Sequence, residues 1–191
     1  MTMLAVDPYA SKVLVKEVHD RLVADIDNFA RDAGIQKHWI WTSLKGIASN
    51  AEITYGRQFK QHQVSGAVSG LAYVGRDDEL VVDDRMAALA GFLLRNFVRA
   101  KLMTLSAVLD AAKDGYISDA TCLLVPNFFM SKKEGGGLPG WQVNLLLDLL
   151  TARKVHGLQT VIYVSDMDAM AQEYGLALSK MVAGNFAIVE L

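Results

Sequence analysis

The stretch Thr160-Val-Ile-Tyr-Val164 is a continuous apolar run that lies between two segments with helical periodicity. Residues 141–156 precede it as a predicted helix that ends at Gly157, and residues 167–181 follow it as a predicted helix with a break at Gly175. Uninterrupted apolar strands are typical of parallel sheets, because helical crossovers cover both faces of such a sheet. This stretch therefore predicts an α/β fold.

The same alternation of strands and helices runs from residue 71 to the end of the chain. Further apolar runs predict strands at residues 71–74, 98–104, 122–125 and 186–189. Helices are expected at residues 85–97 and 106–112, where Ser106 would be the N-cap, and Pro126 would end the third strand. We expect a three-layer α/β sandwich with a mostly parallel sheet of about five strands.

An N-terminal helix is expected before this core. Apolar residues in 10–33 mostly repeat at three- and four-residue steps, with charged residues between them. Residues 35–47 form an aromatic-rich connector, whereas 48–69 are polar and small and give no firm assignment. We therefore divide the chain into a helical arm with connector, residues 1–47, and an α/β core, residues 48–191.

Composition excludes several classes of protein. The 191 residues are 52% hydrophobic and 21% charged, which suits one domain with its own core, and the net charge of −2 excludes coating of nucleic acid by bulk charge. A single cysteine, Cys122, excludes an internal disulfide, and no cysteine or histidine spacing fits zinc, so we expect no metal site. No apolar run is long enough for a membrane span and the first residues lack a signal-peptide pattern, so we expect a cytoplasmic protein without membrane contact.

The loops that follow the predicted strands lack the residues of a nucleotide hydrolase. Ligands of parallel sheets bind beyond the carboxyl ends of the strands. The loop Gly75-Arg-Asp-Asp-Glu-Leu-Val-Val-Asp-Asp84 has one glycine, no lysine and five acidic residues, so it would repel a polyphosphate. Pro126-Asn-Phe-Phe129 offers no carboxylate for Mg²⁺. Asp166, after the fourth strand, is either a helix N-cap or a polar sensor-type side chain.

In their order, several segments resemble the DnaC/IstB-type AAA+ ATPases, which include bacterial helicase loaders and transposition helper ATPases. The segments that carry the resemblance are Ala33-Gly-Ile35, Gly70-Leu-Ala-Tyr-Val-Gly75, Cys122-Leu-Leu-Val-Pro-Asn127, Leu149-Leu-Thr-Ala-Arg153, Thr160–Asp166 and Tyr174–Met181. The resemblance covers residues 33–191 and implies a P-loop NTPase, AAA+-like core. It also implies an arginine-finger-like role for Arg153 and sensor-like roles for Asp166 and Lys180.

The residues that bind and hydrolyse ATP in that family are missing here. The Walker A set of glycine, lysine and threonine is absent, and so are the Walker B acids. The resemblance therefore implies a pseudo-ATPase with no catalytic residue and no cofactor. Two plainer interpretations stay open: Arg153 complements the dipole at a helix end, and Lys180 is simply exposed.

Weak signals for nucleic-acid binding come from basic residues. Lys132-Lys133 lies beside Gly135-Gly-Gly137, and Lys45 follows Trp39 and Trp41, a mixture of base and aromatic that suits stacking of single strands. Alternatively, the tryptophans pack in the core and the charges form a solvated rim. The candidate residues for nucleic acid are Lys132, Lys133, Arg95, Arg99, Lys101 and Lys45.

The function expected from these observations is binding without catalysis. The chain would be a DNA replication or transposition accessory, similar to a helicase loader, that forms a homo-oligomer or joins an ATPase or helicase and touches DNA. One alternative is a purely structural self-assembling protein built on an ATPase-derived interface. The other is an ATPase with an unorthodox nucleotide site, in which Arg76, Arg85 and Arg153 hold the phosphates.

Overall fold

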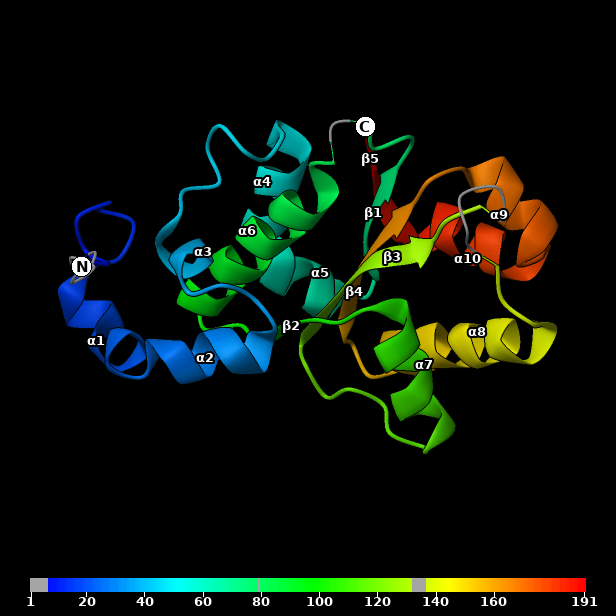
Figure 1. The fold of residues 1–191 in the computed structure, drawn as a ribbon, viewed down its shortest axis with the longest axis horizontal. Helices are drawn as coiled ribbons and strands as arrows, with labels where there is room; N and C mark the ends of the chain where they lie inside the picture. The colour runs from blue at the N-terminus through cyan, green and yellow to red at the C-terminus, as the bar shows by residue number, and fades with distance from the viewer. Residues whose placement is uncertain (1–6, 79, 132–136) are drawn as a thin grey trace, which may run out of the picture.

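The computed structural model describes residues 7–78, 80–131 and 137–191 (Figure 1). In these residues one sheet has the strand order β2-β3-β4-β1-β5, and all neighbouring strands are parallel. The strands are β1 (Gly70–Val74), β2 (Ala100–Leu102), β3 (Cys122–Phe129), β4 (Gln159–Val164) and β5 (Phe186–Glu190). The predicted α/β fold with a parallel sheet of five strands is confirmed.

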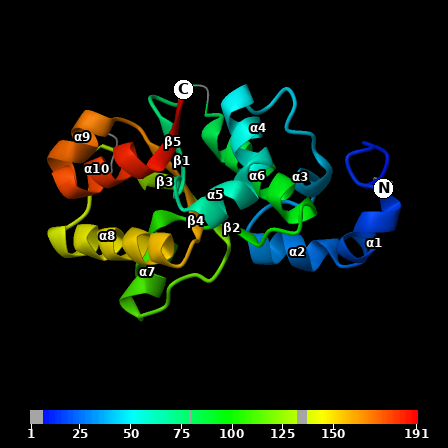
Figure 2. The same cartoon turned by 180° about the vertical axis from the view of Figure 1, so that it is seen from behind.

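Helices cover both faces of the sheet (Figures 1 and 2). Successive side chains of a strand point to opposite faces. Leu71 and Tyr73 of β1 belong to one hydrophobic cluster, whereas Ala72 belongs to a second cluster on the other face. The first cluster joins α1 (Lys16–Ala24), α2 (Ile26–Ala33), α3 (His38–Trp41), α4 (Asn50–Arg57), α5 (Phe59–Ser65) and α6 (Val82–Arg95). The second joins α7 (Leu105–Lys113), α8 (Gly140–Val155), α9 (Met167–Glu173) and α10 (Leu176–Asn185).

The N-terminal third contains more helices than the sequence pattern predicted. The single helix expected over residues 10–33 is two helices, α1 and α2, because Asp25 between them has non-helical dihedral angles (φ −121°, ψ 28°). The unassigned residues 48–69 form α4 and α5. Side chains of the expected arm, such as Leu22 and Ile40, belong to the same hydrophobic cluster as Leu89 of α6.

Two local predictions about the middle of the chain were wrong. Strand β3 continues through Pro126, because β2 pairs only with residues 122–124 and requires no amide hydrogen from Pro126. The register between β3 and β4 shifts between Val125 and Phe129, which accommodates the ring. The N-cap of α7 is Thr104 rather than Ser106, since the Thr104 hydroxyl accepts a hydrogen bond from the Ala107 amide at 3.3 Å.

The chain order creates a switch point between β1 and β4, which are neighbours in the sheet. Strand β1 leads into α6 on one face, whereas β4 leads into α9 on the other. In open α/β sheets the crevice at such a point is the usual ligand site. In the described ranges, no helix is both long enough and apolar enough to cross a membrane.

Candidate functional site

The loop between β1 and α6 is closed by one of its own carboxylates. Asp77 accepts hydrogen bonds from the amides of Val81, at 2.8 Å, and Val82, at 3.1 Å. These amides belong to the first turn of α6, where the backbone of a P-loop would hold a phosphate group. The carboxylate of Asp77 thus uses donors that a bound phosphate would require.

The crevice at this switch point carries excess negative charge. A cavity of about 320 Å³ there is lined by the carboxylates of Asp77, Asp78 and Asp83 and by one cation, Arg76, among the described residues. Arg76 also forms an exposed ion pair with Asp78, with an N–O distance of 3.6 Å. The local field therefore opposes a polyanionic ligand.

Replacing Asp77 with alanine is expected to lower the free energy of unfolding by about 1 kcal/mol, because two amides at the start of α6 lose their partner. Urea denaturation measures the change. Asp78→Ala is the matched control and should stay within about 0.5 kcal/mol of the unsubstituted protein, since among the described residues Asp78 forms only the exposed pair with Arg76. Equal effects of the two substitutions would contradict the capping role of Asp77.

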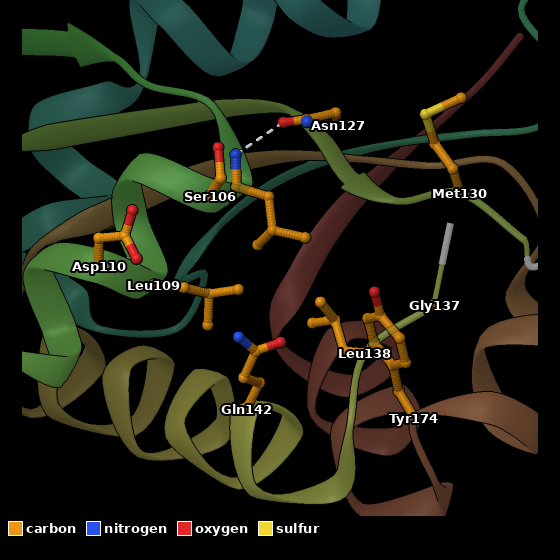
Figure 3. Close-up of a pocket in the computed structure, with 10 residues that line it drawn as sticks. Ser106, Leu109, Asp110, Asn127, Met130, Gly137, Leu138, Gln142 and Tyr174 are labelled. Carbon is orange, nitrogen blue, oxygen red and sulfur yellow. Dashed lines mark hydrogen bonds between the residues drawn. The ribbon is translucent and has the colours of Figure 1, made fainter. Parts of the chain in front are cut away.

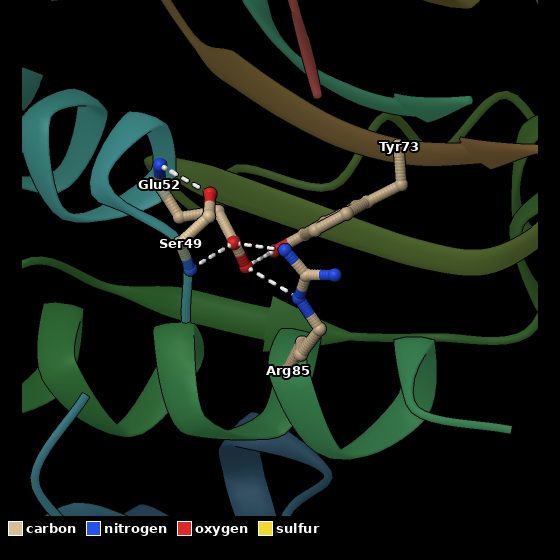
Figure 4. Close-up of polar contacts among 4 residues, drawn as sticks. All are labelled: Ser49, Glu52, Tyr73 and Arg85. Carbon is tan, nitrogen blue, oxygen red and sulfur yellow. Dashed lines mark hydrogen bonds and ion pairs between the residues drawn. The ribbon is translucent and has the colours of Figure 1, made fainter. Parts of the chain in front are cut away.

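A buried polar cluster connects α4, β1 and α6 near this loop (Figure 4). Glu52 of α4 is fully buried and accepts hydrogen bonds from the Tyr73 hydroxyl at 2.7 Å, the Ser49 amide at 2.6 Å and the Arg85 guanidinium. Arg85 is only 13% exposed and lies 5.3 Å from the centre of the Tyr73 ring. The cluster fixes α4 and α6 against β1.

The environment of Glu52 favours its ionised form. Burial by itself would raise the pKa of this carboxyl, but the hydrogen bonds from Arg85, Tyr73 and Ser49 outweigh it, so the pKa lies below its ordinary value. The sequence contains a signal for this residue: Ser49 and Glu52 have the spacing of a capping box, and both of its hydrogen bonds are present.

Arg153 does not fit the role of an arginine finger. Its side chain is fully buried, and its guanidinium donates to the carbonyl oxygens of Ser118 at 2.6 Å and Gln159 at 2.7 Å. Further hydrogen bonds go to the Ala120 carbonyl at 3.1 Å and the Thr160 hydroxyl at 3.0 Å. Burial lowers the pKa of Arg153 to about 10. A finger must reach a neighbouring subunit's nucleotide, and this guanidinium lies inside its own subunit.

The two sensor-like residues occupy exposed positions. Asp166 is the N-cap of α9, and its carboxylate accepts a hydrogen bond from the Ala169 amide at 2.9 Å. This is the capping role that the sequence left open. Lys180 is exposed on α10, so its sensor-like role stays a prediction.

The candidate residues for nucleic acid lie in different environments. Arg95 is buried: it donates to the carbonyl oxygens of Ile40 and Thr42, and burial lowers its pKa to about 10. This placement removes Arg95 from a binding surface. The exposed Arg99 forms an ion pair with Asp119, with an N–O distance of 2.7 Å.

The remaining candidates leave the DNA contact as a prediction. Arg99 and the half-buried Lys101 line a shared cavity beside β2, together with the carboxylates of Asp32 and Asp119. Lys45 is exposed after α3. Lys132 and Lys133 lie outside the described residues.

The structure brings together two of the three arginines of the unorthodox-ATPase alternative, since Arg76 and Arg85 line one cavity, but Arg153 is not part of it. Arg76 pairs with Asp78, Arg85 pairs with Glu52, and Arg153 is buried near the amino end of β4. Among the residues that the structure describes, no group of three or more histidine, cysteine, aspartate or glutamate side chains lies close enough to hold a metal ion.

This chain is similar to known proteins in fold and not in sequence. No protein-family model matches the chain, and no curated protein sequence matches it. Solved structures do match. The DnaC helicase loader has a TM-score of 0.58 at 12% identity, covering 82% of this chain and 99% of that one. A replication initiator DnaA bound to AMPPCP and single-stranded DNA has a TM-score of 0.54 at 13% identity. Domain III of DnaA from Thermotoga maritima has a TM-score of 0.50 at 15% identity.

These likenesses decide the architecture. The fold is AAA+-like. The match to DnaA with AMPPCP covers 78% of this chain and 49% of that one, so this chain spans about half the length of that DnaA structure. The match to domain III covers 78% of this chain and 66% of that domain. At such low identity the agreement concerns the fold.

Proposed function

We propose that this chain is a non-catalytic AAA+-like protein that acts by binding, as a DNA replication or transposition accessory of the helicase-loader kind. The observation that carries the proposal is the carboxylate of Asp77 on the first amides of α6, in a fold shared with the DnaC helicase loader. In an ATPase of this fold, a phosphate group of the nucleotide lies at the position that the carboxylate of Asp77 occupies in this chain.

The proposal of a non-catalytic protein is supported by the lack of groups that phosphoryl transfer needs. A P-loop enzyme uses a lysine on the phosphates and carboxylates that hold Mg²⁺. This chain has no lysine between Gly75 and Asp84, and Pro126 and Asn127 stand where the acids would be. Of the three arginines of the rival interpretation, Arg76 and Arg85 line one cavity beside the loop but are paired with carboxylates, whereas Arg153 is buried away from it. We therefore place the function in contacts with macromolecules.

The partners proposed are a second copy of the chain, or an ATPase or helicase, together with DNA. Structural neighbours that are a helicase loader and a single-stranded-DNA complex of DnaA support this choice. Lys45, Lys132 and Lys133 are the proposed DNA contacts, with Arg99 and Lys101 beside β2 as a second group.

Binding of a fluorescent single strand, followed by anisotropy at several salt concentrations, tests the DNA contact. We expect affinity to fall as salt rises, because lysines that contact phosphates release counterions. Lys132→Ala/Lys133→Ala should weaken binding and reduce the salt slope by about 2, or about one per lost phosphate contact, without changing the melting temperature.

The matched control is Lys12→Ala/Lys16→Ala, which also removes two lysines but from the N-terminal region. Unchanged affinity in the Lys132/Lys133 variant would reject that assignment. Absence of salt-sensitive binding by the unsubstituted chain would favour the purely structural alternative, in which the fold only builds an assembly.

A further inference from the structure

The two edges of the sheet differ in their protection, and β2 is the protected one. Its strand is short, Ala100–Leu102, and its backbone groups alternate between β3 and the outer side. Because the Met103 amide donates to the Leu124 carbonyl of β3, the Leu102 carbonyl points outward. The end of α2 covers that carbonyl, since a Cβ added to Gly34 would lie 2.5 Å from its oxygen. A short, covered edge strand is protected from pairing with another chain.

Strand β5 is the last strand on the other side of the sheet, and its outer edge is open (Figure 2). The Leu191 amide donates to the Val74 carbonyl of β1, so by alternation the amide and carbonyl groups of Ile188 point away from the sheet, as does the amide of Glu190. In the described part of the chain these outward groups have no hydrogen-bond partner. The Ile188 side chain is 42% exposed, so this edge is accessible to another strand.

The sequence of β5 has none of the usual features that prevent edge-to-edge pairing. Edge strands of natural proteins commonly carry a proline, a lysine or a bulge. Phe186-Ala-Ile-Val-Glu190 contains neither proline nor lysine, and its register against β1 has no shift. Its one charged residue, Glu190, is at the end of the strand. An apolar, regular and exposed edge of this kind favours pairing with a further strand.

The outward groups of β5 are complementary to those of a second, antiparallel β5. With the Ile188 residues of both copies at a two-fold axis, each Ile188 amide would donate to the other Ile188 carbonyl. In the same register each Glu190 amide would lie opposite the Phe186 carbonyl of the other copy, which also points outward. The Phe186 amide is not required, because it donates to the Val182 carbonyl of α10. The pattern of donors and acceptors therefore fits a second copy of the same strand.

Side chains and charges agree with this register. The two exposed Ile188 side chains would lie directly across from each other, and apolar β-branched pairs in this position stabilise strand pairing. Glu190 would lie opposite Phe186 and not opposite another carboxylate. The two Glu190 residues would be offset by about 13 Å along the strands, which exceeds the Debye length of about 8 Å at physiological salt. Like charges therefore do not oppose the pairing of two copies.

We propose that β5 is the surface through which two copies of this chain pair antiparallel and join their sheets into one. The pairing rests on the proposed function, in which a second copy is one of the partners, and gives that copy its surface. It is separate from the cavity between α7, α8 and the end of β3, whose described lining includes no residue of β5 (Figure 3). Substitutions in β5 therefore test the pairing without altering the described lining of that cavity.

Sedimentation of the chain at concentrations from about 1 to about 200 μM tests the pairing. The contact is small, so we expect a monomer–dimer equilibrium with a dissociation constant in the micromolar range. Ile188→Lys places two ammonium groups across from each other and should weaken dimerisation about 10-fold. The matched control is Ile117→Lys, which makes the same change at a residue that is 40% exposed in the connection between α7 and β3. It should leave the dimer unchanged, and circular dichroism checks that both variants are folded.

Mixing Ile188→Lys with Ile188→Glu tests the two-fold register itself. Each variant alone places like charges across the axis, whereas a heterodimer places an ammonium group opposite a carboxylate. The mixture should therefore dimerise about 10-fold more tightly than either variant alone. Amide hydrogen exchange locates the contact: the amides of Ile188 and Glu190 should exchange more slowly as the concentration of the unsubstituted chain rises.

The outcomes separate the pairing from the DNA contact of the proposed function. A chain that stays monomeric at every concentration yet binds single strands in a salt-dependent way would overturn the pairing and leave the DNA contact standing. A dimer that responds to Ile188→Lys but binds no DNA would support the pairing and reject the DNA contact. If the dimer were unaffected by Ile188→Lys, β5 would not be the interface. Protection of the Ile188 amide only after a partner ATPase or helicase is added to a monomeric chain would reject the second copy as the occupant of this edge.

Discussion

Replacing Arg153 with methionine is expected to lower the free energy of unfolding by about 3–5 kcal/mol. The guanidinium donates to the carbonyl oxygens of Ser118, Ala120 and Gln159, and none of these oxygens gains a new donor when methionine is present. Arg153 is fully buried, so water does not replace it. Methionine retains most of the apolar volume, so the loss reports the hydrogen bonds rather than a large cavity.

The matched control for Arg153→Met is Lys180→Met, which removes a cation from an exposed position of α10. It should change the free energy of unfolding by no more than about 0.5 kcal/mol. Chemical denaturation of both variants gives the comparison. Suppose that Arg153→Met had the stability of the unsubstituted chain but abolished the activity of a partner ATPase. The structural role of the buried guanidinium would then be wrong, and the arginine-finger role would be supported instead.

Glu52→Ala is expected to destabilise the protein by about 3 kcal/mol. The substitution removes the capping box at the start of α4, worth about 1 kcal/mol, and leaves Arg85 largely buried without its carboxylate. It also removes the acceptor of the Tyr73 hydroxyl, which is buried under α4 and α6. Glu17→Ala, at an exposed position of α1, is the control and should be close to neutral.

The same cluster predicts a dependence of stability on pH. The pKa of Glu52 is lowered in the folded state, so the unfolded chain binds this proton more readily. The contribution of Glu52 to stability is complete above its unfolded pKa, about 4.3, and is lost as the pH falls through the folded value. Glu52→Gln should therefore lose less stability on acidification than the unsubstituted chain. If the two proteins lost the same amount of stability as the pH falls, this assignment would be contradicted.

The strands could be predicted from the sequence because a parallel sheet covered on both faces requires continuous apolar runs. The runs beginning at Leu71, Cys122, Thr160 and Phe186 all lie within strands. Pro126 misled the prediction because its effect depends on whether a neighbouring strand requires its amide, and β2 has already ended there. The length of β2 is a tertiary feature, which local sequence does not determine.

At the candidate site, the burial of charged side chains was the feature that the sequence could least predict. The family resemblance predicts a role for Arg153, and the local group of basic residues predicts one for Arg95, but each is buried against backbone carbonyl groups of distant segments. Only the tertiary structure brings those carbonyls to the side chain. By contrast, the acidic character of the loop after Gly75 could be predicted, because it depends on composition alone. The hydrogen bonds from the amides at the start of α6 to Asp77 depend on the geometry of the loop, which composition does not determine.

Calorimetric titration of the purified chain with ATP and Mg²⁺, with light scattering on the same sample, tests the central claim most directly. A DnaA protein, whose structure with AMPPCP is known, serves as the positive control for nucleotide binding. We predict no heat of binding for this chain together with scattering from an assembled species. Clear micromolar binding would contradict the account, because it would show that the acidic loop and Asp77 do not prevent a nucleotide from binding, and the ATPase alternative would then take first place.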